Sequence, residues 1–298
     1  MNKNFKLEGI LPALITPFCE DGVTINEDSV KKLVDLHIKQ GAEGFYIIGG
    51  TGEGIVLSRE QREIMCEYAV KHIGGRKTVI NHVAAVNFNE AIELAKHAEK
   101  NGVDAIAAIP PVFFSYTEED IYNYYKRLAD AVSIPLIIYY HPSAQPKMSV
   151  ELLARIFEID NVTGVKWSST NFFEMMKLKE KTHGEMNIIN GPDELLVSGL
   201  AAGADAGIGS TYNIMLPQFI EVYKNFKSGN MEKAMEIQRK INNVITAILK
   251  NDLIPAVKYA VNLMGIDAGN AVFPMKQYNA EDKKALERDL ADAGWPFV

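Results

Sequence analysis

The segment Asn161–Ser169 reads NVTGVKWSS, a short β-prone run with hydroxyl residues at its end and a single cation, Lys166, inside it. A run of this kind, followed by a helical segment, is typical of a strand in a buried parallel sheet. Burial makes the neutral amine of a lysine easier to reach, and a neutral amine can form a Schiff base with a ketone. The residue alone favours a simpler interpretation, a lysine at a strand end with its ammonium in water.

The same alternation of strand-like and helix-like segments recurs along the chain with a period of about 30 residues, the length of a βα unit. The helix-like segments carry start and stop signals, such as an N-cap at Ser58 and a C-cap at Asn101-Gly102. The predicted strands are Leu11–Thr16, Gly44–Ile48, Thr78–His82, Ala105–Ile109, Leu136–Tyr140, Gly164–Trp167, Asn187–Ile189 and Ala206–Ile208.

Eight consecutive βα units predict a parallel sheet that closes into a (β/α)8 barrel, the TIM barrel, which typically takes about 250 residues. Beyond the eighth unit the pattern is helical, with periodic segments at Met231–Leu249 and Leu253–Met264. We therefore expect a single domain over 1–298, with the barrel at about 7–228 and C-terminal helices at about 229–298. The alternative, a doubly wound open sheet, usually carries a Gly-rich dinucleotide turn after its first strand, and Pro17–Gly22 lacks that turn.

The composition argues against several classes of function. The 298 residues carry a formal net charge of -7, whereas nucleic-acid phosphates need a basic face, so no nucleic-acid partner is expected. No apolar run is long enough to span a membrane, and the run at 9–16 fits a first strand better than a signal peptide. Cys19 and Cys66 show neither a disulfide framework nor metal-ligand spacing, which favours a reduced, cytoplasmic setting. The 6 histidines form no helical pair at ligand spacing, so no metal is expected.

Candidates for chemistry are the residues at the C-terminal ends of the strands, where a barrel carries its active site. The glycines of Gly49–Gly54 let backbone N–H groups converge on a carboxylate or phosphate, and Thr51 adds a hydroxyl donor. A tight turn without a ligand fits the same residues equally well. Tyr139, at the end of the fifth strand, can relay a proton, although a packed aromatic is the commoner case. Strand alternation lets only one of Tyr139 and Tyr140 point inside.

Acidic and small residues follow the last two strands. Asp193 and Glu194 can bind a polyol through charge-assisted hydrogen bonds, but acids at the start of a helix also act as caps. The segment Gly207–Asn213 leaves room for a ligand and equally fits an ordinary N-cap. His82 lies in the apolar run of the third strand, and we interpret it as a core histidine.

As an ordered set, the motifs at these strand ends resemble those of the pyruvate-dependent aldolase family, which includes N-acetylneuraminate lyase and dihydrodipicolinate synthase. The resemblance runs from about Leu7 to about Met264 and implies a (β/α)8 barrel with a C-terminal helical segment, usually assembled as a homotetramer. For Lys166, the resemblance favours a reactive amine over a lysine whose ammonium lies in water. The motifs are Gly50-Thr51-Gly52-Glu53, Tyr139 with Pro142, Gly164-Val165-Lys166, Gly191-Pro192-Asp193-Glu194 and Gly207-Ile208-Gly209-Ser210-Thr211.

The resemblance assigns roles to individual residues of this chain. Lys166 matches the Schiff-base lysine, and Tyr139 matches the catalytic tyrosine, with Ile137 and Tyr139 pointing inward and Tyr140 outward. Gly50 and Thr51 correspond to the pair that holds the pyruvate carboxylate, and Ser168 corresponds to a hydroxyl position beyond the lysine. The positions that hold the sugar chain in the sialic acid lyases correspond to Gly191, Asp193, Glu194 and Ser210. No metal or organic cofactor is implied, because the lysine itself supplies the electron sink.

This chain departs from the family pattern at three places. Gly50-Thr51 stands where the family usually has Ser-Thr or Thr-Thr, so one hydroxyl is missing. Phe113 and Phe114 stand where many relatives have a relay tyrosine. The loop Pro142–Pro146 is one residue short and lacks the arginine that holds a second substrate carboxylate in the synthase, which weighs against that activity.

The function implied by the resemblance is that of a Schiff-base aldolase. Such an enzyme reversibly cleaves a 2-keto-3-deoxy sugar acid to pyruvate and a sugar aldehyde, and N-acetylneuraminate, yielding N-acetylmannosamine, is the first expectation. The alternatives are a condensation like that of dihydrodipicolinate synthase, a 2-keto-3-deoxy sugar-acid aldolase or dehydratase, and a non-enzymatic sensor that binds a keto acid. The sequence leaves the aldehyde and the physiological direction open.

Overall fold

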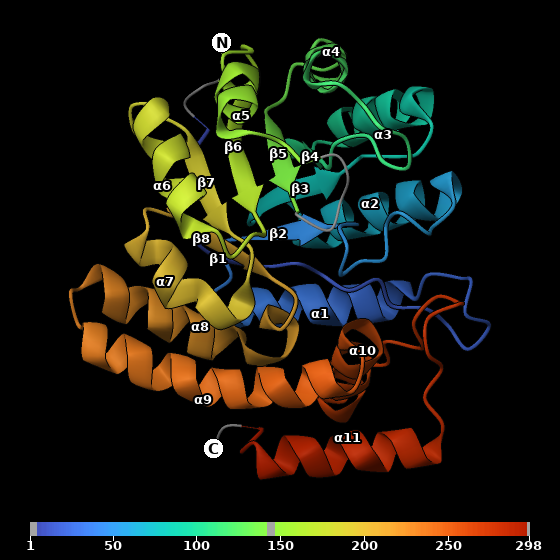
Figure 1. Ribbon diagram of the computed structural model, residues 1–298. Helices are drawn as coiled ribbons and strands as arrows, with labels where there is room; N and C mark the ends of the chain where they lie inside the picture. Colours follow the sequence, from blue (N-terminus) through green and yellow to red (C-terminus); the bar gives the residue numbers. More distant parts are fainter. Residues whose placement is uncertain (1–4, 142–146, 297–298) are drawn as a thin grey trace.

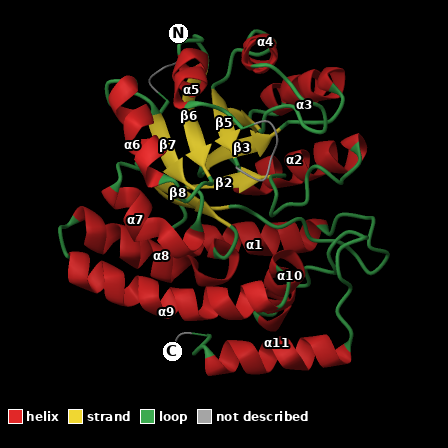
Figure 2. Cartoon of the chain, in the orientation of Figure 1, coloured by secondary structure: helices red, strands yellow, loops and turns green. Residues whose placement is uncertain are grey.

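The computed structural model describes residues 5–141 and 147–296. Within these ranges strands and helices alternate, and the strands gather at the centre with helices around them (Figure 1, Figure 2). The strands are β1 Gly9–Pro12, β2 Gly44–Ile47, β3 Thr78–His82, β4 Ala105–Ala108, β5 Leu136–Tyr140, β6 Val162–Trp167, β7 Asn187–Asn190 and β8 Ala206–Gly209. The helices are α1 Glu27–Gln40, α2 Arg59–Ile73, α3 Phe88–Lys100, α4 Glu118–Ala129, α5 Val150–Phe157, α6 Phe172–Lys181, η1 Asp193–Leu195, α7 Leu196–Ala201, α8 Tyr212–Lys227, α9 Met231–Lys250, α10 Leu253–Leu263 and α11 Ala280–Asp292.

The eight strands form one parallel sheet in the order β1-β8-β7-β6-β5-β4-β3-β2. The two ends of this order meet through a parallel bridge between Ala13 and Tyr46, and the Leu14 N–H donates to the Tyr46 carbonyl at 2.8 Å. The sheet therefore closes on itself, which confirms the predicted (β/α)8 barrel and makes the alternative of an open, doubly wound sheet wrong.

The first strand, β1, covers Gly9–Pro12 and so begins and ends earlier than the predicted run Leu11–Thr16. Pro12 has no N–H to donate, so the regular ladder stops there. Ala13 still donates its N–H to the Gly209 carbonyl at 2.9 Å, which keeps the chain against β8 for one more residue. The remaining predicted strands agree with the observed ones to within two residues.

Helix starts follow the capping residues seen in the sequence. The Ser58 hydroxyl accepts from the Gln61 N–H, and Thr117 does the same for Asp120, each as part of a reciprocal capping box. These caps satisfy backbone N–H groups that have no partner inside the helix. The caps fix the residues at which α2 and α4 begin. They therefore also fix the length of the loops that join these helices to β2 and β4.

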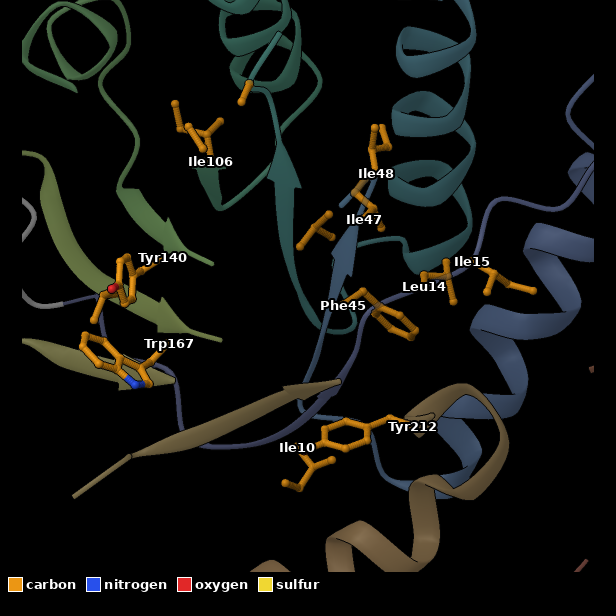
Figure 3. Close-up of a cluster of buried hydrophobic side chains, with 14 of the residues drawn as sticks. Ile10, Leu14, Ile15, Phe45, Ile47, Ile48, Ile106, Tyr140, Trp167 and Tyr212 are labelled. Carbon is orange, nitrogen blue, oxygen red and sulfur yellow. The ribbon is translucent and has the colours of Figure 1, made fainter. Parts of the chain in front are cut away.

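The side chains of the strands divide between two layers of core. Leu11, Tyr46, Ile137, Tyr139 and Ile208 belong to the group that fills the barrel interior, as the predicted inward orientation of Ile137 and Tyr139 requires. Tyr140 belongs to the layer between strands and helices, where its ring lies 4.7 Å from the ring of Trp167, centroid to centroid (Figure 3). Strand alternation therefore separates the two adjacent tyrosines as expected.

The C-terminal helices lie on one side of the barrel. α9 runs along α8, while α10 and α11 pack against α9 (Figure 1). Lys258 in α10 also reaches Glu53 in the loop after β2, so these helices touch the barrel mouth as well as its outer layer. Within the described residues, no helix is both long and apolar enough to cross a membrane.

Candidate active site

A cavity of about 460 Å³ lies at the carboxyl ends of β2, β5, β6, β7 and β8. Residues from five different strand ends converge there, as expected for a barrel. Every residue assigned a site role from the sequence lines it, namely Gly50, Thr51, Tyr139, Lys166, Ser168, Gly191, Asp193, Glu194 and Ser210.

Lys166 lies near the end of β6 with only 6% of its surface exposed. Its Nζ donates to the Ser168 hydroxyl at 3.2 Å and lies 4.0 Å from the centre of the Tyr139 ring. The Tyr46 ring centre is 5.6 Å away. The surroundings of the amine are therefore aromatic faces and one hydroxyl, which is a setting for a nucleophile rather than for a surface cation.

Tyr139 stands beside Lys166 because β5 and β6 pair in parallel with these two residues in register. Its ring makes edge contacts with Tyr46 and His82, at centroid distances of 6.0 and 5.9 Å. Burial lowers the pKa of His82 to about 3, and the positive charges of Arg62 and Lys166 act in the same direction. His82 is thus an uncharged, buried residue that supports Tyr139, in line with its interpretation as a core histidine.

The glycine-rich loop places one hydroxyl in the cavity and leaves space beside it. The Thr51 and Ser210 hydroxyls share a hydrogen bond of 2.7 Å, which joins the ends of β2 and β8. A Cβ added at Gly50 would meet nothing closer than the Tyr139 hydroxyl, at 3.8 Å. A β-carbon would therefore fit at this position, and without a side chain Gly50 leaves this space next to Tyr139 open.

A buried ion pair, which the sequence motifs do not indicate, anchors this loop. Lys258 Nζ lies 2.8 Å from Glu53 Oε1, and the other carboxylate oxygen accepts from the Val272 N–H at 2.6 Å. Ile48 and Glu53 both adopt positive φ, at 59° and 61°, a conformation that costs free energy in residues other than glycine. The ion pair therefore holds Glu53, at the end of the loop that carries Gly50 and Thr51, in its strained conformation. A lysine inside the apolar helix LIPAVKYAVNL is the one signal that points to it.

Asp193 and Glu194 follow β7 on a short 3-10 turn. The Asp193 carboxylate accepts from the N–H and the hydroxyl of Thr211, at 2.7 and 2.6 Å, so it caps the start of α8 instead of its own helix. Burial raises the pKa of Asp193 to about 6, while the Thr211 hydrogen bonds and the charge of Lys166 lower it. The Asn242 amide donates to the Glu194 carbonyl at 3.0 Å, which ties this turn to α9.

Part of the cavity lining has no counterpart among the residues expected from the sequence. It is apolar and comes from the C-terminal helices: Ile245 and Leu249 in α9, Leu253 and Ile254 in α10. Helical periodicity shows that these helices have an apolar face, but it does not show which end of the barrel that face meets.

Two other departures from the family pattern involve residues that are not part of the described cavity lining. Phe113 and Phe114 are 85% and 65% exposed and are not among the residues that line it. The short loop Pro142–Pro146 lies outside the described residues. Among the residues that are described, no group of three or more His, Cys, Asp or Glu side chains is placed to hold a metal ion.

Nearly the whole chain is similar to proteins of one known family. Residues 6–293 match the model of the dihydrodipicolinate synthetase family. N-acetylneuraminate lyase of Rhizobium meliloti is 32% identical over 96% of this chain and 95% of its own length. The solved structure of CdNal from Clostridium difficile in complex with mannosamine has a TM-score of 0.93 at 30% identity, covering 97% of this chain and all of that one. Sialic acid aldolase of Ruminococcus gnavus has a TM-score of 0.92 at 32% identity, covering 98% and 99% of the two chains.

Proposed function

This chain belongs to the dihydrodipicolinate synthetase family, and on that premise we propose that it reversibly cleaves N-acetylneuraminate to N-acetylmannosamine and pyruvate. It is a carbon–carbon lyase of the class I aldolase type, so the alternative of a non-enzymatic sensor is set aside. The observation that carries the proposal is the pairing of a buried Lys166 with hydroxyl and carboxylate groups on the neighbouring strand ends, all in one cavity.

In the proposed cleavage, the neutral amine of Lys166 attacks the C2 ketone of the keto acid. The carbinolamine loses water to leave an iminium ion, which draws electrons from the C3–C4 bond. Tyr139, whose ring lies against the amine, relays the proton of the 4-hydroxyl as that bond breaks and the aldehyde leaves: its hydroxyl oxygen receives this proton while its own hydroxyl proton passes to the substrate carboxylate. The resulting enamine takes a proton at C3, and water then releases pyruvate and the free lysine.

The rest of the cavity would hold the two ends of the substrate. Gly50 and Thr51 present backbone N–H groups and a hydroxyl to the keto-acid carboxylate, in a loop kept in place by Glu53. Asp193, Glu194 and Ser210 line the part of the cavity suited to sugar hydroxyls. The basic residues in the described lining are Lys166 and His141, and neither is an arginine. The sequence Pro142–Pro146 contains no arginine either. These residues therefore offer no guanidinium group to a second substrate carboxylate.

The proposal is tested by offering N-acetylneuraminate, 2-keto-3-deoxygluconate, and aspartate semialdehyde with pyruvate to the purified protein. Release of pyruvate and N-acetylmannosamine from the first substrate alone supports the proposal. Lys166→Ala serves as the blank for non-enzymatic cleavage. Turnover of aspartate semialdehyde with pyruvate would instead identify the synthase reaction, and no turnover of N-acetylneuraminate would contradict the proposed substrate.

A second candidate follows from Gly50. The opening beside the Tyr139 hydroxyl lies at the part of the site where the proton is transferred. It favours, as the second candidate, a different 2-keto-3-deoxy sugar acid that is cleaved or dehydrated through the same imine. Cleavage or water loss from 2-keto-3-deoxygluconate, with N-acetylneuraminate left intact, would establish this alternative. We also propose a homotetramer acting in the cytoplasm, as the family resemblance implies, and light scattering of the purified protein measures the assembly.

A further inference from the structure

The proposed cleavage contains a proton transfer to carbon that needs an acid in the cavity. When the C3–C4 bond breaks, its electron pair moves into the enamine, and C3 must gain a proton before pyruvate leaves. Tyr139 relays a different proton, that of the 4-hydroxyl. Because C3 is bonded to C2, the carbon that carries the lysine nitrogen, the acid must lie close to Lys166.

His141 lies in the position that this step requires. It follows Tyr139 by two residues, just beyond the end of β5, and so continues the inward-facing series of that strand. Its side chain lines the cavity together with Lys166. The His141 ring makes an edge contact with the Tyr139 ring at a centroid distance of 5.9 Å, and Lys166 Nζ lies 4.0 Å from the centre of the same tyrosine ring. The imidazole and the amine therefore flank one aromatic side chain.

The surroundings of His141 suit transfer of a proton near neutral pH. Burial and the positive charge of Lys166 both lower the pKa of His141, so its conjugate acid gives up a proton readily. The side chain is only partly buried, which leaves the imidazole able to exchange protons with water. The acids of the described lining are engaged elsewhere: the Asp193 carboxylate accepts two hydrogen bonds from Thr211, and Glu194 lies on the same turn, at the end proposed for the sugar.

We propose that His141 is a further catalytic residue, which exchanges a proton between its imidazole and C3 of the enamine on Lys166. The proposal rests on the imine chemistry of the proposed function and is independent of which sugar acid is cleaved. During cleavage an N–H bond of the imidazolium breaks, the electron pair of the enamine double bond forms the C3–H bond, and the iminium is restored. The imidazole then regains a proton from the substrate carboxyl group, which has received one through Tyr139 and is the stronger acid.

The reverse transfer is measured with pyruvate alone in D₂O. Neutral His141 removes a methyl proton from the pyruvate iminium, and the imidazolium, after exchange with the solvent, returns a deuteron. Proton NMR follows the loss of the methyl signal, and Lys166→Met gives the uncatalysed rate. In His141→Gln the exchange should slow by about 10²- to 10⁴-fold, the usual contribution of a general acid–base group, while borohydride still traps pyruvate on Lys166.

The matched control is His97→Gln. His97 lies in α3, forms an ion pair with Glu67 and is not part of the cavity lining, so this variant should exchange the methyl protons at the wild-type rate.

Two further measurements distinguish proton transfer from a purely structural role. Free imidazole should restore part of the exchange in His141→Ala, because a small base can enter the space left by the side chain. Tyr139→Phe should lose far more of the cleavage rate than of the exchange rate, because pyruvate has no 4-hydroxyl.

The inference is overturned by wild-type exchange in His141→Gln, by no recovery of His141→Ala with imidazole, or by loss of trapping in both His141 variants. It is also overturned if Tyr139→Phe loses as much of the exchange as of the cleavage. Failure of the two proposals is distinguishable in the wild-type protein. The absence of any pyruvate adduct on Lys166 contradicts the proposed function, whereas an adduct without methyl exchange contradicts only the role of His141.

Discussion

Among the residues that the structure describes, two lysines are buried, and they differ in what surrounds the amine. Lys166 is 6% exposed and Lys258 is 1% exposed, and each amine lies over an aromatic ring, Tyr139 at 4.0 Å and Phe18 at 4.4 Å. Lys258 faces the carboxylate of Glu53, whereas the hydrogen-bond partner of Lys166 is the hydroxyl of Ser168. Burial alone therefore does not distinguish a structural lysine from a reactive one.

The carboxylate accounts for the difference in role. Burial lowers the pKa of Lys258, while the charge and the hydrogen bond of Glu53, 2.8 Å away, act against that lowering. Its donors are also used, because Nζ bonds the Asn270 carbonyl at 2.7 Å in addition to Glu53. Within 5–141 and 147–296, Lys166 forms no ion pair, and it lines a cavity large enough for a substrate. We therefore propose that Lys166 carries the chemistry and that Lys258 supports the loop.

The largest effect is expected from Lys166→Met. Without the amine no imine forms, and pyruvate release should fall by about 10⁴-fold or more, the usual scale for loss of a nucleophile. Lys166→Arg should be equally inactive, because a guanidinium keeps the charge but is not a nucleophile. A coupled lactate dehydrogenase assay measures the rate, and activity above about one per cent in either variant would refute the role of Lys166.

Tyr139→Phe makes the aromatic neighbour of Lys166 the same as that of Lys258. The ring contacts with Tyr46 and His82 are kept, so the melting temperature should change little. The proton acceptor is lost, so kcat should fall by about 10²- to 10⁴-fold while pyruvate trapping on Lys166 persists. Loss of trapping together with activity would mean that Tyr139 shapes the site and does not relay the proton.

Lys258→Met leaves Glu53 buried without its partner. Breaking a buried ion pair in this way costs about 3–5 kcal/mol, which denaturant unfolding measures. The double variant Glu53→Gln, Lys258→Met should recover part of the loss, because no charge is left unpaired. Lys126→Met is the control, since its ion pair with Asp130 is exposed to water and its loss should change the free energy of unfolding far less. Equal losses at Lys126 and Lys258 would contradict the structural role of the buried pair.

The smallest effect concerns Asp193 and its dependence on Lys166. Burial raises the pKa of Asp193 from 3.8 to about 6, so the folded state favours the protonated form. The stability gained from that form is complete below about pH 3.8 and is lost as pH rises through about 6. Asp193→Asn should therefore flatten the pH dependence of the melting temperature in this window.

The electrostatic effect of Lys166 on Asp193 is measured by the same titration. Because the charge of Lys166 lowers the pKa of Asp193, Lys166→Met should move the window to higher pH. Thermal unfolding of the wild type and of both variants between pH 4 and 8 tests this pair of expectations. An unchanged window in Lys166→Met would show that the amine does not act on Asp193 electrostatically.

Local patterns predict most of the barrel and its reactive end. Alternation along β5 separates Tyr139 from Tyr140, and the motifs at the strand ends identify residues that meet in one cavity. The Glu53–Lys258 pair joins residues 205 positions apart, and no local pattern carries that information. The apolar cavity lining from the C-terminal helices is not predictable for a related reason, since the periodicity of α9 and α10 indicates an apolar face but not what that face contacts.

The central claim is that only one of the two buried lysines forms the imine. Incubation with pyruvate, reduction with borohydride and peptide mapping by mass spectrometry test it directly. We predict a reduced pyruvate adduct on Lys166 and none on Lys258, with no adduct in Lys166→Met. An adduct on Lys258, or the absence of any adduct on Lys166 in active protein, would contradict the account.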